Sequence, residues 1–239
     1  MEHGRLGHCR VRLLLRWGFR VPEPEAIRAV RDIAGVKIRR RIGVLGGSFD
    51  PPHVGHIEIA RRAKEAIGLD KVLLVVAGNP YQKRPRASAE DRYEMTVRAA
   101  RGLDGIEVPR FELDRPGPSY TIDTVEALRR QDPFAEIWLI LGADALNGIK
   151  SWHRWEELVD SVKFCVVPRE GFPLEDALSA LNERRGEFCV LDSVKPLPYS
   201  STSIRRAVAS GKRPEGVDPA VASYIEERGL YRFSEDRGG

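Results

Sequence analysis

Residues 46–56 read Gly46-Gly47-Ser48-Phe49-Asp50-Pro51-Pro52-His53-Val54-Gly55-His56. This stretch follows a short apolar run at 42–45 and leads into residues 56–67, whose apolar positions recur with the spacing of one helix face. We expect a buried strand, a glycine-rich turn and a helix in that order. Glycines after a strand let backbone N–H groups approach an anion closely, and the start of a helix adds a favourable dipole. The sequence therefore predicts a phosphate-binding loop.

Strand-like and helix-like segments alternate along the rest of the chain. The further strands are expected at 72–77, 106–108, 137–141, 163–167 and 188–191, and the further helices at 88–101, 121–130, 154–159, 174–185, 201–210 and 219–228. This alternation predicts an α/β fold of the Rossmann-like, doubly wound kind, with a mostly parallel sheet and helices on both faces. Ligands of such sheets bind at the carboxyl ends of the strands.

The bulk composition limits the class of protein. With 239 residues, 42% of them apolar, the chain can form one well-cored domain, which we expect at 41–233 between a basic appendage at 1–40 and a short tail at 234–239. The appendage could also result from a start site assigned too early. No run of about 18 apolar residues occurs, so no membrane span is expected. The three scattered cysteines fit a reducing, cytoplasmic compartment.

The positive charge is concentrated at one end of the chain. Residues 1–41 contain eleven Lys and Arg but four Asp and Glu, whereas the net charge of the whole chain is +4. The remainder is therefore mildly acidic. A nucleic-acid-binding protein would carry positive charge over its folded face, so we expect no nucleic-acid partner.

The two histidines of the first loop are candidate phosphate ligands. His53 and His56 are three residues apart where the helix should begin, so both rings can lie on one helix face. Two donors there could stabilise the charge on transferring phosphoryl oxygens. A metal site with Asp50 as third ligand is the alternative. The stiff Pro51-Pro52 pair and the lack of a further ligand nearby favour phosphate, so we predict no protein metal ligands.

A second hydroxyl-rich loop lies near the end of the chain. Residues 199–205 read Tyr199-Ser200-Ser201-Thr202-Ser203-Ile204-Arg205. The hydroxyls of Ser201 and Thr202 are predicted to cap a helix and leave N–H groups for an oxyanion. Arg205, about one turn further on, can bind phosphate through its guanidinium. Taken alone, this stretch favours an ordinary capped helix with a surface arginine.

The two loops together resemble the nucleotidyltransferase superfamily. Its first signature is Gly-Gly-Thr-Phe-Asp-Pro-x-His-x-Gly-His, with Ser48 here in place of Thr, and its second is Ser-Ser-Thr-x-Ile-Arg, matched from Ser200 to Arg205. The resemblance implies an adenylyl transfer without a covalent enzyme intermediate, in which His53, His56 and Arg205 form the catalytic set. The implied ATP-binding residues are Gly46, Gly47, Ser48, Phe49, Lys83, Gly142, Asp144, Ser201 and Thr202.

Three further stretches point to one family within this superfamily. Residues 118–124, 141–144 and 151–158 are similar to the bacterial nicotinate mononucleotide adenylyltransferases, and this similarity extends over about 41–233. It implies that Trp152 stacks on the pyridine ring, that Thr121 binds the nicotinate carboxylate and that Asn79 lies in the same site. Trp155 is expected to serve packing. For Asp144, binding near the ribose of ATP and helix capping remain equally open.

One departure from the family pattern stands after the second strand. Many members have Pro-Pro-x-His-Lys there, whereas this chain has Pro80-Tyr81-Gln82-Lys83 and no histidine. Lys83 still provides a positive charge that can bind phosphate. The resemblance further implies ATP and nicotinate mononucleotide as substrates and Mg²⁺ bound with ATP. Nicotinamide mononucleotide, phosphopantetheine, a CTP-dependent acceptor and a non-catalytic nucleotide-binding module remain alternatives. A homo-oligomer is compatible with the sequence.

Overall fold

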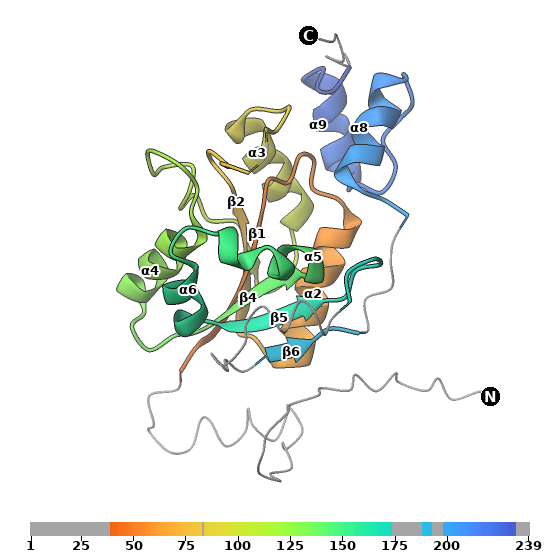
Figure 1. The fold of residues 1–239 in the computed structure, drawn as a ribbon. Helices are drawn as coiled ribbons and strands as arrows, with labels where there is room; N and C mark the ends of the chain where they lie inside the picture. Colours follow the sequence, from red (N-terminus) through yellow and green to blue (C-terminus); the bar gives the residue numbers. More distant parts are fainter. Residues whose placement is uncertain (1–38, 83, 174–187, 193–197, 233–239) are drawn as a thin grey trace, which may run out of the picture.

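The computed structural model describes residues 39–82, 84–173, 188–192 and 198–232. Six parallel strands form its centre, in the spatial order β3-β2-β1-β4-β5-β6 (Figure 1). Their bounds are β1 Arg41–Gly47, β2 Lys71–Val76, β3 Ile106–Glu107, β4 Glu136–Gly142, β5 Lys163–Val167 and β6 Phe188–Val190. This is the Rossmann-like order, and the strand sequence reverses between β1 and β4. The predicted fold class is confirmed.

Continuous apolar sequence explains the central strands. In β1 residues 42–45 are all buried, and in β2 so are residues 72–76. Strands buried on both faces read as unbroken runs of branched apolar residues, because helices cover each side of the sheet. Leu45 pairs in register with Leu74 on β2 and Ile140 on β4, which aligns the ends of the three strands at one edge.

The helices form a layer on each face of the sheet. Their bounds are α2 Val54–Ile67, α3 Ala89–Ala100, α4 Thr121–Gln131, α5 Ala143–Asn147, α6 Trp155–Ser161, α8 Ser201–Ala209 and α9 Pro219–Glu227, with a 3₁₀ turn, η1, at Ile149–Ser151. Buried residues of α4, α5 and α6 pack on one face, and those of α2 and α3 on the other. A third cluster joins α3 to α9. None of the described helices has the length and apolarity needed to cross a membrane.

Several boundaries differ from the sequence prediction. Helix α2 begins at Val54 rather than at 56, because His53 itself caps it, and it ends at Gly68 in the left-handed region with φ 68°. Helix α3 begins at Ala89, one residue later than the predicted 88, because Ser88 is its cap and accepts from the Asp91 N–H. The two short elements α5 and η1 were not predicted. The predicted helix at 174–185, residues 1–38 of the proposed appendage at 1–40, and the proposed tail at 234–239 lie outside the described residues.

Candidate active site

The first loop lies at the carboxyl end of β1, beside the point where the strand order reverses. Phe49 adopts φ 48°, in the left-handed region, and its buried ring lies under Gly47. A Cβ on Gly47 would stand 3.2 Å from that ring, whereas a Cβ on Gly46 would meet no atom within 4 Å. The backbone at Gly46 is therefore open on the side where a side chain would stand, as close approach of an anion requires.

The paired histidines are fixed by the start of α2. The ring nitrogen Nδ1 of His53 accepts from the Gly55 N–H at 3.1 Å, and Nδ1 of His56 accepts from the His53 N–H at 3.2 Å. The ring centroids are 3.8 Å apart. Because each Nδ1 is an acceptor, each neutral ring carries its proton on Nε2. The two histidines thus form the reciprocal cap of α2 and present N–H donors of the same kind.

The charge state of His53 follows from its surroundings. Burial disfavours the charged ring, and the nearby Arg169 repels it, so the pKa falls from 6.5 to about 4. His53 is therefore neutral near pH 7. It can donate from Nε2 while Nδ1 remains the helix cap, which a doubly protonated ring could not be.

Because the pKa of His53 is lowered by folding, the stability of the fold should depend on pH. The unfolded chain protonates His53 below about pH 6.5, but the folded chain resists protonation until about pH 4. The unfolded state therefore binds more protons in this window, so the free energy of unfolding decreases as pH falls, by at most about 3 kcal/mol. Urea titrations at pH 7 and pH 4.5 measure the decrease. His53→Asn, which can still cap the helix but cannot titrate, should lose less stability; equal losses would contradict the assignment.

Asp50, which the sequence suggested only as a ligand of the alternative metal site, is a buried hub of the first loop. It is 4% exposed, and its carboxylate accepts from Tyr231 Oη at 2.7 Å, from the Arg86 N–H at 2.8 Å and from the Ala87 N–H at 3.1 Å. Its backbone carbonyl accepts from Nη1 of Arg205 at 2.7 Å. These four groups come from three separate parts of the chain. Asp50 is thus a structural hub that joins these three parts of the chain.

Arg92 on α3 holds two loop ends together. It is 2% exposed, and its guanidinium donates to the carbonyls of Ser48 and Ala77 at 2.9 and 2.6 Å. It also donates to the carbonyls of Gly78 and Ala87, both at 3.3 Å. A buried cation is tolerated here because backbone carbonyls accept its hydrogen bonds. The loops after β1 and β2 are fixed to each other in this way.

The second loop meets the first directly. Ser201 Oγ donates to the carbonyl of Pro51 at 2.8 Å, beside the Arg205 contact with the Asp50 carbonyl. Arg205 Nη2 also donates to Thr202 Oγ1 at 3.2 Å. The predicted caps are wrong: Ser200 caps α8, because it has the extended backbone that a cap requires and accepts from the Ser203 N–H. The hydroxyl of Ser201 is instead used to join the two loops.

The end of β4 provides a third group of residues. A Cβ on Gly142 would stand 2.3 Å from Oδ1 of Asp144, so a larger residue there would displace the Asp144 side chain from its present position. Gly142 occupies the N-cap position of α5, and the capping alternative for Asp144 is therefore excluded. Asp144 instead faces Arg169, with 3.7 Å between Oδ1 and Nε. Arg169 follows β5, and its positive charge also lowers the pKa of His53. It was not among the residues predicted from the sequence.

The residues assigned to the acceptor come from neighbouring segments. Asn79 and Ser119 exchange two hydrogen bonds of 2.9 and 3.0 Å, which join the loop after β2 to the start of α4. Thr121 is the first residue of α4. The ring of Tyr120 stacks on His153 with 4.1 Å between centroids, directly after Trp152. Trp152 and Trp155 both pack against the core cluster that includes α4. The sequence had assigned packing to Trp155, and the structure adds Trp152 to it.

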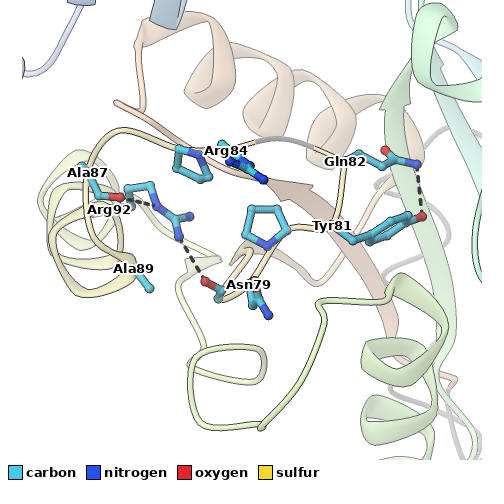
Figure 2. A pocket seen from close by; sticks show the side chains of 10 residues that line it. Asn79, Tyr81, Gln82, Arg84, Ala87, Ala89 and Arg92 are labelled. Carbon is cyan, nitrogen blue, oxygen red and sulfur yellow. Dashed lines mark hydrogen bonds between the residues drawn. The ribbon is translucent and has the colours of Figure 1, made fainter. Parts of the chain in front are cut away.

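A pocket of about 560 Å³ lies under the loop after β2. Figure 2 shows Asn79, Tyr81 and Gln82 along this loop, with Arg92 reaching in from α3. Among the described residues, Asn79 is the one predicted site residue in its lining; Thr121, Trp152 and the two histidines do not line it. Lys83 lies outside the described residues. Within the described ranges, no group of three or more His, Cys, Asp and Glu side chains could hold a metal ion.

Comparison with known proteins identifies the family. Residues 44–207 match the cytidylyltransferase-like family model. A probable nicotinate-nucleotide adenylyltransferase of Thermus thermophilus is 45% identical over 193 residues, which cover 80% of this chain and all of the relative. This chain belongs to the nicotinate-nucleotide adenylyltransferase family. A second member, from Mycolicibacterium vanbaalenii, is 42% identical over 86% of this chain and 98% of its own length.

The fold is supported independently by a solved structure. The structure of a Plasmodium falciparum nicotinic acid mononucleotide adenylyltransferase complexed with NaAD has a TM-score of 0.67, with 20% identity over 82% of this chain and 99% of that chain. At this identity the likeness concerns the fold. As a member of the nicotinate-nucleotide adenylyltransferase family, the chain is a nucleotidyltransferase, as its sequence predicted.

Proposed function

We propose that this enzyme transfers the adenylyl group of ATP to nicotinate mononucleotide and releases deamido-NAD and pyrophosphate, a step of NAD biosynthesis. The observation that carries the proposal is the contact between the two predicted phosphate loops. Ser201 and Arg205 donate to the carbonyls of Pro51 and Asp50 across 150 and 155 residues of sequence. The arginine and the two histidines are thereby brought to the same edge of the sheet, where α/β folds bind nucleotides.

The reaction requires alignment and charge neutralisation. An oxygen of the acceptor phosphate forms a bond to the α-phosphorus of ATP, and the bond from that phosphorus to the oxygen bridging to the β-phosphate breaks. The acceptor phosphate is already ionised at pH 7, so no general base is needed. Nε2–H groups of His53 and His56 can donate to phosphate oxygens as charge develops, and the guanidinium of Arg205 can neutralise the leaving pyrophosphate.

Other groups at this edge support ATP. The open backbone at Gly46 can approach the phosphates, with Gly47, Ser48 and Phe49 forming the same turn. Ser201 and Thr202 begin α8, whose N-terminus favours anions. We assign Gly142 and Asp144 to the ribose side. Mg²⁺ bound with ATP would supply further charge neutralisation and would be held mainly by the phosphates and water.

The acceptor site is assigned to the segments around α4. Thr121 offers a hydroxyl and a backbone N–H at the start of the helix, which suits the carboxylate of nicotinate. Trp152 offers an aromatic face for the pyridine ring. Asn79 reaches the same region through its hydrogen bonds with Ser119. The names of the relatives support nicotinate over the amide.

A test of acceptor choice follows. Purified protein is given Mg-ATP with nicotinate mononucleotide, nicotinamide mononucleotide or phosphopantetheine, and pyrophosphate release is measured. We expect the highest kcat/KM with nicotinate mononucleotide, by roughly tenfold or more, because a site built for a carboxylate leaves its donors unpaired with the amide. Preference for the amide would overturn the acceptor assignment. ATP binding without turnover of any acceptor would favour a nucleotide-binding module.

A further inference from the structure

Tyr231, near the carboxyl end of the described chain, contacts the hub of the first loop. Its hydroxyl donates to Oδ1 of Asp50 at 2.7 Å, across 181 residues of sequence. Tyr231 adopts φ 63°, in the left-handed region that a tyrosine rarely occupies, and its ring is buried with Met95, Val221 and Ile225. The backbone is thus held in an unfavourable conformation where the ring is inserted toward the active-site edge.

The phenol is a fixed donor at this position. Burial and the adjacent carboxylate of Asp50 raise its pKa far above the ordinary value of a tyrosine. The hydroxyl therefore remains protonated at any pH at which the enzyme works, and Asp50 Oδ1 has it as a permanent donor together with the Ala87 N–H.

Asp50 is also an electrostatic partner of Arg205. Nη1 of Arg205 lies 3.8 Å from Oδ2 of Asp50 while it donates to the Asp50 carbonyl. The carboxylate and the triphosphate of ATP are both anions that attract this guanidinium. The donors on Oδ1 and Oδ2 partly neutralise the carboxylate, so they weaken its hold on Arg205.

We propose that Tyr231 is a positioning residue for adenylyl transfer, which acts through Asp50 to leave Arg205 available to the phosphates of ATP. The inference rests on the proposed function, since it needs Arg205 to bind ATP. Without the phenol donor, the Ala87 N–H is the one donor to Oδ1 that remains among the described residues, and the buried carboxylate attracts Arg205 more strongly. Binding and turnover of ATP should then weaken, whereas the acceptor site around α4 is not part of this network.

The test uses Tyr231→Phe, which keeps the ring and removes the hydroxyl. Its matched control is Tyr224→Phe on α9, because Tyr224 Oη also donates to a carboxylate, Asp91 Oδ1 at 2.9 Å, but does not contact Asp50. Steady-state rates are measured against ATP and against nicotinate mononucleotide, with Tm for each variant. We expect Tyr231→Phe to lower kcat/KM for ATP about tenfold, the scale for a lost hydrogen bond to a charged group, and to leave KM for the acceptor within about twofold. Tyr224→Phe should leave both within about twofold.

A double-mutant cycle with Arg205→Ala tests whether Tyr231 acts through Arg205. If Tyr231 acts through Arg205, Tyr231→Phe should change kcat/KM less than about twofold in the Arg205→Ala background. An undiminished effect there, or equal kinetics of the two phenylalanine variants, would overturn the role of Tyr231 while the proposed function stands. An Arg205→Ala enzyme with native kcat/KM would instead reject the proposed role of Arg205, and with it this inference.

Discussion

Replacing His53 with alanine is expected to lower kcat by roughly 10²- to 10³-fold, the scale for losing one donor to a transition state. His53 is a neutral donor, because its pKa is lowered to about 4 and its Nδ1 is occupied by the Gly55 N–H. Pyrophosphate release at saturating ATP and nicotinate mononucleotide measures the loss.

The same substitution also removes a helix cap, which costs about 1 kcal/mol of stability. His53→Asn separates the two effects, since asparagine caps helices well but its shorter side chain does not reproduce the imidazole donor. We expect Asn to restore most of the Tm lost in the alanine variant while kcat stays low. Near-normal turnover of His53→Ala would reject the catalytic assignment, and recovery of kcat with Asn would reduce His53 to a cap.

Arg205→Ala is expected to reduce kcat/KM for ATP by about 10²-fold or more, because the variant loses a charge-assisted pair to phosphate at the active-site edge. Arg205 is half-buried between Asp50 and Thr202, so its guanidinium is already oriented before ATP binds. Kinetics with ATP as the varied substrate measure the effect.

Two variants serve as controls for Arg205. Arg206→Ala removes the same charge from the next, exposed position of α8 and should change kcat/KM less than about twofold. Arg205→Lys keeps the charge but lacks the planar fork, so it should recover only part of the loss. If Arg206→Ala were as harmful as Arg205→Ala, the effect would be one of net charge and not of a specific phosphate contact.

The fold was largely predictable because the sheet is buried on both faces. Strands such as β2 appear as unbroken apolar runs, and most helices show one apolar face between clear caps. The elements that were not predicted or were misplaced have physical reasons. Helix α5 has five residues and η1 three, too short for a periodic pattern. The start of α2 was placed late because histidine is an unusual cap, although His53 fills that position here.

The two phosphate loops could be predicted, but their mutual contacts could not. Ser201 and Arg205 meet carbonyls of the first loop, and hydrogen bonds over such separations leave no local pattern in the sequence. Asp50 and Arg169 were missed as hub and partner for the same reason. Arg92 did carry a signal: it stands on the inward face of α3 with Met95 and Thr96, where a charge is unexpected. Such a residue indicates a buried polar network.

The roles of the histidines and of Arg205 share one requirement, that the bond broken is the one between the α- and β-phosphates of ATP. ATP labelled at the α-phosphate tests this most directly when it is incubated with the enzyme, Mg²⁺ and nicotinate mononucleotide. The account predicts that the label appears in deamido-NAD and that the pyrophosphate released is unlabelled. Label in pyrophosphate or in free phosphate, or no labelled dinucleotide at all, would contradict it.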